Sequence, residues 1–474
     1  MRTGNKFITL ALASVLALFG CTPKGVYQEG LIYPDYMDVT IPYNIAPLNF
    51  HYGPEVSGRT ATTFKAAGHT VEIKGRNVLW DMETWKRLCE AAKGSDIMVT
   101  TTASDKSWTI HVSEDEIDSF LSYRLIEPGY EVWNEVEIRE RNITNFDEKA
   151  LSDSKNTNNS CMNCHIHSQG RADLSLMYVR GANGGAFLNR DGEIRKLNLR
   201  DKDMISSTVY GELHPSGRYG VFSTNIIIPG FHTFGSNRLE VYDTESDLVI
   251  ADFDSNEMSS SPLVTRKDVF ETFPVFSADG RTIYYCSADT VSLPENVKDL
   301  KYSLKSISFD EKTGRLGSDI KTVWDAEEHG GSVCHPKCSP DGRFLMYTVA
   351  DYGTFPIWHR ECDLELMDLS TGKIIPMDEA NSDRSDTYHS WSSSSRWFVF
   401  ASKRGDGQYG KPYFCHIDEN GNVTKPFVLP QKDSYHYDKT LKSFNIPDLS
   451  KESVNFDAET IGQMVREMKA EEFR

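Results

Sequence analysis

Short apolar stretches, each preceded by the same kind of polar turn, recur along the middle of the chain. The turns are His214–Arg218, Ser277–Arg281, Ser339–Arg343 and a degenerate copy, Ser392–Arg396, whose arginines are spaced 63, 62 and 53 residues apart. Pro-Asp-Gly favours a tight turn, because Pro fixes φ and Gly adopts the left-handed conformation. The five residues after each turn are apolar almost throughout, which is typical of a strand covered on both faces. We therefore predict a repeated unit built from strands.

The length of the repeat favours one all-β architecture. Further strand and turn segments, such as Leu364–Asp368 followed by Ser370–Gly372, lie between the repeated turns. Four strands in each of several radially arranged units form a β-propeller. An array of sandwich domains is the alternative, but such domains need about 100 residues each. Residues 119–445 thus predict a β-propeller of six or seven blades, at about 50 residues per blade.

A smaller β-rich domain with one helix is predicted at residues 41–118. Asp81 is suited to cap a helix that ends at Gly94, because apolar side chains follow it at helical spacing. These are Met82, Trp85, Leu88, Cys89 and Ala92. Residues 70–74, 97–102 and 108–112 have the pattern of strands.

The first 20 residues resemble an export signal. Arg2 and Lys6 precede an apolar run from Phe7 to Phe19, which is too short to span a bilayer. The run ends at Leu18-Phe19-Gly20-Cys21, which predicts lipidation of Cys21. A plain secretory signal with a chance cysteine is the alternative. Residues 21–40 then form a tether, and the mature chain is predicted to be lipid-anchored at a membrane.

The C-terminal residues 446–474 are predicted to carry a helix. Ile461, Met464, Val465 and Met468 recur at helical spacing between Asp457 and Met468. A frayed tail is the alternative.

Charge and missing motifs exclude several functions. The net charge is −18, whereas proteins that coat nucleic acid or anionic membrane surfaces carry a basic excess. The sequence contains no Gly-x-Ser-x-Gly, P-loop or His-Glu-x-x-His motif, so hydrolase and nucleotide chemistry is not favoured.

One motif indicates a cofactor. Cys161-Met-Asn-Cys164-His165 has the spacing with which two thiols form thioethers to a haem and the histidine becomes an axial ligand of the iron. The preceding residues 152–160 are polar, so we expect the motif in a haem-binding loop near 152–170, with one haem edge accessible. A zinc or copper site that includes His167, a thiol–disulfide exchanger and a structural disulfide are the alternatives.

Three residues are candidates for the second axial ligand of the iron, namely Met177, His214 and His232. We favour His232, because the glycine-led aromatic segment Gly230-Phe-His-Thr-Phe could bring its ring close to a flat cofactor. The remaining cysteines are expected to be mainly buried thiols, although export permits disulfides and Cys334 with Cys338 has the spacing of half a metal site. They are Cys89, Cys286, Cys334, Cys338, Cys362 and Cys415. His359, Trp391, Arg396 and Arg404 lie between repeats, where packing between blades is favoured over ligand contact.

The Ser-Pro-Asp-Gly-Arg segments resemble the PD40-like repeats of TolB-type propellers. Wider stretches resemble exported TolB-like propeller proteins of Bacteroidetes type that carry a cytochrome c motif, over roughly residues 41–445. These stretches are Ile45–Phe50, Tyr123–Tyr130, Thr354–His359, His389–Ser392 and Lys425–Gln431. The resemblance implies a propeller fold and a haem c cofactor. Residues 22–29 lack the acidic run that marks some lipoproteins of these bacteria for the cell surface, so a periplasm-facing anchor is expected.

These features together predict an exported, lipid-anchored propeller with one covalent haem c, bound by Cys161, Cys164, His165 and His232, with His165 and His232 on the iron. We expect a role in envelope electron transfer or redox sensing, with an unidentified redox or scaffold protein as partner. The alternative is a scaffold propeller that binds a protein, peptide or glycan. An enzyme is not favoured, although a haem peroxidase with a free sixth position stays open.

Overall fold

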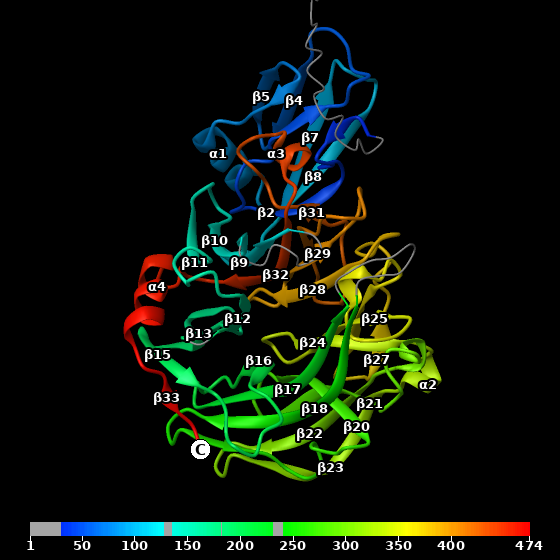
Figure 1. Ribbon diagram of the computed structural model, residues 1–474. Coiled ribbons are helices and arrows are strands. Elements are labelled where there is room, and N and C mark those ends of the chain that lie inside the picture. Colours follow the sequence, from blue (N-terminus) through cyan, green and yellow to red (C-terminus); the bar gives the residue numbers. More distant parts are fainter. Residues whose placement is uncertain (1–29, 128–134, 182, 231–239) are drawn as a thin grey trace, which may run out of the picture.

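The computed structural model describes residues 30–127, 135–181, 183–230 and 240–474, which form mostly β-strands (Figure 1). Cys21 and His232 lie outside these residues. Among the described helices, none is both long and apolar enough to cross a membrane.

Most of the chain forms six sheets of successive antiparallel strands. The first contains β9 (Phe120–Ile126), β10 (Glu137–Asn142), β11 (Glu148–Asp153) and β32 (Ser443–Ser450). The second contains β12 (Met162–Ser168), β13 (Arg171–Val179), β14 (Gly185–Arg190), β15 (Glu193–Asn198) and the short parallel β33 (Glu471–Glu472). The third contains β16 (Thr208–Leu213), β17 (Tyr219–Gly230), β18 (Glu240–Asp252) and β19 (Glu257–Ser259).

The other three sheets follow in chain order. The fourth contains β20 (Val269–Phe276), β21 (Thr282–Asp289), β22 (Ser303–Asp310) and β23 (Arg315–Trp324). The fifth contains β24 (Ser332–Cys338), β25 (Phe344–Ala350), β26 (Asp363–Asp368) and β27 (Lys373–Ile375). The sixth contains β28 (Asp386–Trp391), β29 (Trp397–Ser402), β30 (Lys411–His416) and β31 (Phe427–Val428).

One edge strand of each of these sheets lies at a common centre. β12, β16, β20, β24 and β28 each contact the next, and β32 contacts both β28 and β12. The contacts therefore form a closed ring, which is the arrangement of a β-propeller. β32 comes from the C-terminal end of the chain but pairs with β9 in the first sheet (Figure 1). The predicted end of the propeller at residue 445 thus falls inside a strand that closes the ring.

The repeated turns form as predicted. Gly217, Gly280 and Gly342 have φ values of 75°, 71° and 74°. Each donates its backbone N–H to the carbonyl oxygen of the first residue of its turn. Ser395 takes the same place in the degenerate copy, with φ of 57° and a bond to the Ser392 carbonyl oxygen. The apolar stretch after each turn lies in the second strand of its sheet, largely buried.

The residues before the ring form two smaller sheets and a helix. β2 (Val39–Pro42), β8 (Ser107–Ser113), β7 (Ser95–Thr101), β4 (Ala61–Ala66) and β5 (His69–Lys74) form one sheet, and β1 (Ile32–Tyr33), β3 (Phe50–Tyr52) and β6 (Asn77–Val78) form the other. The predicted helix is α1 (Met82–Ala92), and Asp81 caps it by accepting the Thr84 N–H. Its buried residues share one apolar core with Trp397, Val399, Phe414 and Phe427 of the sixth sheet.

The predicted C-terminal helix is α4 (Ala458–Glu467), which begins after the cap Asp457. It buries Ile461, Met464 and Val465 against the first two sheets. The remaining short helices are α2 (Ala326–His329) and α3 (His436–Lys439), with 3-10 turns at Val297–Asp299 and Pro356–Trp358.

Candidate cofactor site

A cavity of about 570 Å³ lies at the centre of the ring. Residues from all six innermost strands line it, and most of its wall is apolar. This volume is within the range of about 300–1,000 Å³ that is typical of small-molecule and cofactor sites. The centre of the ring is therefore large enough for an organic cofactor.

The innermost strands share a local irregularity that shapes the cavity wall. Each of them shifts register against its neighbour at the same point. The residue at this point lies four positions before the serine or histidine that begins the following turn or, in β32, before Ser450. We call these positions the bulge residues: Cys164, Tyr210, Phe273, His335, Tyr388 and Ile446.

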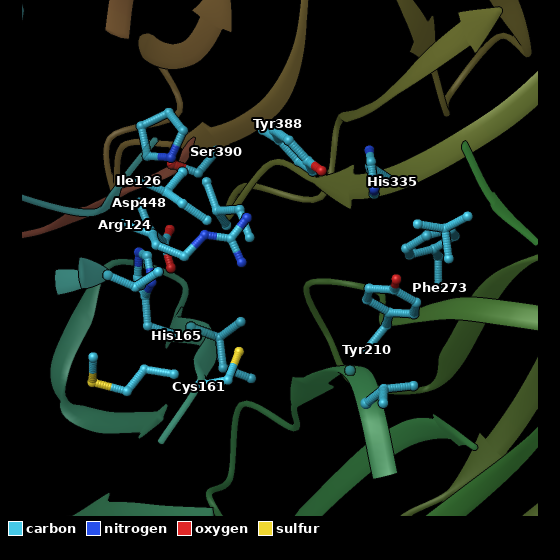
Figure 2. Close-up of a pocket in the computed structure, with 18 of the residues that line it drawn as sticks. Arg124, Ile126, Cys161, His165, Tyr210, Phe273, His335, Tyr388, Ser390 and Asp448 are labelled. Carbon is cyan, nitrogen blue, oxygen red and sulfur yellow. The ribbon is translucent and has the colours of Figure 1, made fainter. Parts of the chain in front are cut away.

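Five of the bulge residues, namely Tyr210, Phe273, His335, Tyr388 and Ile446, line the cavity (Figure 2). Phe273, His335, Tyr388 and Ile446 have φ values between 50° and 55°, a conformation that non-glycine residues seldom adopt. A β-bulge turns a side chain away from the regular alternation of a strand. Strained backbone of this kind clusters at functional sites.

The Cys-x-x-Cys-His motif lies on this wall and not in an exposed loop. Residues 154–159 form turns, as their polarity indicates, but Met162–Ser168 is the innermost strand of the second sheet. The motif therefore does not lie in a loop as expected, because Met162–Ser168 is a strand that is held in the ring between β32 and β16. Cys164 is the bulge residue of β12, between Cys161 and His165.

Cys161 and His165 both line the cavity (Figure 2). The Cys161 thiol is partly exposed and free. His165 is only 3% exposed. Its ring lies close to the backbone of Ser122 and Ile446, but within the described residues neither ring nitrogen forms a hydrogen bond of normal geometry. Burial, and secondarily His167, lowers the pKa of His165 to about 3. The ring is thus neutral at physiological pH, which is the form of histidine that binds metals.

Cationic side chains lie at the cavity wall near the motif. Arg124 extends from β9 beside His165 and Asp448 (Figure 2), and Arg180 follows the end of β13. Arginine is suited to pair with carboxylate groups in a fixed geometry. A porphyrin with two carboxylate groups matches both the apolar wall and these two cations.

A charged layer separates the central cavity from a second cavity of about 50 Å³. Lys337 and Asp448 line both cavities, and Lys337 forms an ion pair with Glu212. Burial raises the pKa of Asp448 to about 6, although Lys337 opposes the shift. Burial alone would lower the pKa of Lys337, but the carboxylates of Glu212 and Asp448 raise it. Lys337 is therefore charged. It pairs with Glu212 and also interacts electrostatically with Asp448 at the centre of the ring.

His167, the other histidine of the motif region, contributes to this layer. Its backbone N–H donates to Asp448 Oδ2 at 2.8 Å, and its Nε2 lies 2.9 Å from the Ser122 hydroxyl. A zinc or copper site that includes His167 finds no support among the described residues, where no group of three or more His, Cys, Asp or Glu side chains could hold a metal ion.

The predicted candidates for the second axial position lie in different places. Met177 is directly opposite His165 in the pairing of β12 with β13. Such pairs have Cβ atoms about 5 Å apart on one face of a sheet, so these two residues do not suit opposite sides of one porphyrin. His214 is in a turn, where Ser216 Oγ and the Gly280 carbonyl oxygen lie 2.7 and 3.2 Å from its ring nitrogens. His232 lies outside the described residues.

The other residues that the sequence singled out are buried thiols or form contacts within the protein. Cys89, Cys286, Cys334, Cys362 and Cys415 are buried free thiols, and Cys338 is a free thiol with partial exposure. His359 Nε2 is 3.0 Å from Glu240 Oε1, and Arg404 forms an ion pair with Asp386 at 2.9 Å. Trp391 lines the smaller cavity, and its Nε1–H donates to the Lys337 carbonyl oxygen. Neither His359 nor Arg404 lines the central cavity.

Of the bulge residues, sequence reasoning singled out Cys164 and missed Tyr210, Phe273, His335, Tyr388 and Ile446. The sequence does contain a signal for these positions, because each bulge residue lies four residues before the start of a repeated turn or, in β32, before Ser450. A proline often follows the bulge residue, as in Phe273-Pro274 and His335-Pro336.

The fold and the site together define an all-β propeller protein whose central cavity carries a Cys-x-x-Cys-His motif. No family model matches the chain, and no curated protein matches it.

Solved structures with a similar fold include TolB from Acinetobacter baumannii, with 12% identity and a TM-score of 0.41, covering 70% of this chain and 66% of that chain. A hypothetical selenium-binding protein from Sulfolobus tokodaii has 9% identity and a TM-score of 0.41, covering 73% and 96%. The periplasmic gluconolactonase of Pseudomonas aeruginosa has 15% identity and a TM-score of 0.33, covering 66% and 96%.

Proposed function

We propose that this protein is a six-bladed propeller that carries one covalent haem c in its central cavity and acts in electron transfer or redox sensing in the cell envelope. One observation carries the proposal. Cys161 and His165 of a Cys-x-x-Cys-His motif line one wall of a largely apolar central cavity of cofactor size. A solvated loop or a structural disulfide would not require such a cavity.

Different residues would form the covalent, axial and ionic contacts to the haem. Cys161 and Cys164 would form the two thioethers, and His165 would be the axial ligand on the same wall. Arg124 and Arg180 would pair with the carboxylate groups, while the bulge residues exclude water from the macrocycle. Covalent haem supplies reversible one-electron chemistry. The apolar surroundings of the cavity would tune its potential.

The test is expression of the exported body in a host that attaches haem c, followed by a pyridine haemochrome spectrum. We expect a c-type spectrum that is lost in the Cys161→Ala/Cys164→Ala variant. Cys338→Ser is the matched control, because its thiol is also partly exposed but belongs to another sheet. An unmodified protein without the spectrum, in a host that loads a control cytochrome, would refute the proposal.

Lipid anchoring is part of the proposal and rests on the sequence around Cys21 alone. Metabolic labelling with a radioactive fatty acid should mark the full chain and not its Cys21→Ser variant. Labelling of both, or of neither, would remove the anchor from the proposal.

A scaffold role is the second candidate, and the hairpin of β17 and β18 favours it. Ile226, Ile227 and Ile228 are 40%, 37% and 48% exposed, and Ile227 also lines the central cavity. Exposed apolar patches commonly mark contacts with partners. A variant that lacks both thiols of the motif but keeps its partner and its cellular phenotype would favour this role over redox chemistry.

A further inference from the structure

The second axial position is the open question in the proposed haem site, and the order of the sheets around the ring bears on it. The innermost strands follow one another as β32, β12, β16, β20, β24 and β28, and the ring closes back to β32. Two strands therefore separate β12 from β24 in either direction. The wall that carries His165 faces the wall that carries His335.

His335 is the bulge residue of β24 and the only histidine among the six bulge residues. Its φ of 50° places its ring on the cavity wall, across the open space from Cys161 and His165 (Figure 2). A positive φ at a bulky residue costs free energy. In β24 this strained conformation occurs at the residue whose imidazole, that of His335, lines the cavity.

Neighbouring side chains orient the His335 ring. The Phe273 ring packs edge-on against it at 4.5 Å, and the Tyr388 ring lies 4.7 Å from it. Both neighbours are bulge residues of the adjacent strands. Thr387 Oγ1 lies 3.4 Å from Nδ1, so Nε2 is the nitrogen assigned to a metal bond. A second-shell contact of this kind to one ring nitrogen is typical of metal-binding histidines.

The other histidine at the cavity is placed differently. His389 is 4% exposed, and its Nε2 lies 3.0 Å from the Met346 carbonyl oxygen inside the neighbouring sheet. It belongs to β28, which is not the strand opposite β12. His389 is therefore a packing residue of the wall.

We propose that His335 is the second axial ligand of the haem iron, opposite His165. This inference rests on the proposed haem c function and replaces the predicted candidates Met177, His214 and His232. Two imidazole ligands hold the iron low-spin and give a lower potential than a methionine ligand gives. They also leave no position for an external ligand. The protein would then transfer electrons and would not act as a peroxidase.

Spectroscopy of the haem-loaded protein tests the proposal without an activity assay. The unmodified protein should show a low-spin spectrum and no reaction with carbon monoxide after reduction. Near-infrared magnetic circular dichroism should show the charge-transfer band of two nitrogen ligands. A high-spin iron, or a histidine–methionine band, in the unmodified protein would overturn the assignment even if no variant could be made.

The variants identify the residue. His335→Ala should keep its covalent haem, become high-spin, gain carbon monoxide binding and return to low-spin on addition of imidazole. His232→Ala is the matched control and should keep the spectrum of the unmodified protein. A low-spin His335→Ala that excludes carbon monoxide, or a high-spin His232→Ala, would overturn the proposal. Absence of haem from the unmodified protein would refute the proposed function. A haem-loaded protein with the wrong spectrum would refute only the assignment of His335, so the two failures are distinguishable.

Discussion

Lys337 of β24 forms an ion pair with Glu212 of β16 across the channel, past the intervening strand β20. The Lys337 side chain is 26% exposed and the Glu212 side chain 12% exposed, and both line the smaller cavity. Asp448 lies close enough to raise the pKa of Lys337 together with Glu212. One cation thus neutralises carboxylates from two other sheets and links the sheets at their centre.

Replacing Lys337 by methionine should destabilise the protein. The change leaves Glu212 and Asp448 without their cation, and breaking a buried ion pair costs about 3–5 kcal/mol. Because the channel leaves Lys337 partly accessible, we expect the lower end of this range in urea unfolding. The Glu212→Gln/Lys337→Met variant should recover part of the loss. Equal stability of Lys337→Met and the unmodified protein would show that the ion pair contributes nothing.

Replacing His165, the proposed axial ligand, by leucine should stabilise the haem-free protein. Each buried polar group without a partner costs about 1–3 kcal/mol, and within the described residues neither ring nitrogen of His165 forms a hydrogen bond of normal geometry. We expect a gain of about 1 kcal/mol or more in the free energy of unfolding. His214→Leu is the contrasting variant, because it removes contacts to Ser216 and Gly280, and it should lose stability. A destabilised haem-free His165→Leu would mean that His165 is a packing residue.

The titration of Glu271 should lower the free energy of unfolding as the pH rises from about 5 to 8. Burial, and then the nearby Asp247 carboxylate, raises the pKa of Glu271 to about 8 in the folded protein, against about 4.3 in the unfolded chain. The folded state therefore holds this proton more tightly, and its stabilising contribution is complete below about pH 4 and lost by about pH 8. Glu271→Gln should flatten the fall in urea unfolding at several pH values. Identical slopes for the two proteins would contradict this assignment.

Thiol reactivity should separate the motif from the other cysteines. Cys161 is partly exposed, whereas Cys89, Cys286, Cys334 and Cys362 are buried, and burial raises the pKa of each of these four thiols. The thiolate is the reactive form. In the haem-free protein we expect iodoacetamide to modify the peptide with Cys161 and Cys164 first, and the four buried thiols only after unfolding. Mass spectrometry of a time course measures this order.

The predictions from sequence succeeded where the signal is local. The glycine turns, the buried strand after each turn and the cap of α1 at Asp81 depend on a few adjacent residues, and the structure contains all of them. The Cys-x-x-Cys-His motif was misplaced because the polar residues before it suggested a loop. Yet Cys164 lies four positions before Ser168, the spacing that His335 has before Ser339.

The rest depends on contacts between distant residues. His335 follows His165 by 170 positions, and only the closure of the ring makes their strands face one another. The candidates that the sequence offers for the second ligand, Met177, His214 and His232, all lie nearer to the motif. β32 likewise gave no sign in its own residues that it pairs with β9. Non-local strand pairing of this kind is set by the whole fold and not by local preference.

The closing strand also sets an order of events during synthesis. β32 lies near the C-terminal end of the chain, nearly 300 residues after the motif, and its pairing with β9 completes the wall around Cys161. Under the proposed function, a porphyrin would reach these thiols most directly before that wall is complete. Thioether formation would then come before the pairing of β32 with β9, and loading of the cofactor would be coupled to the closure of the ring.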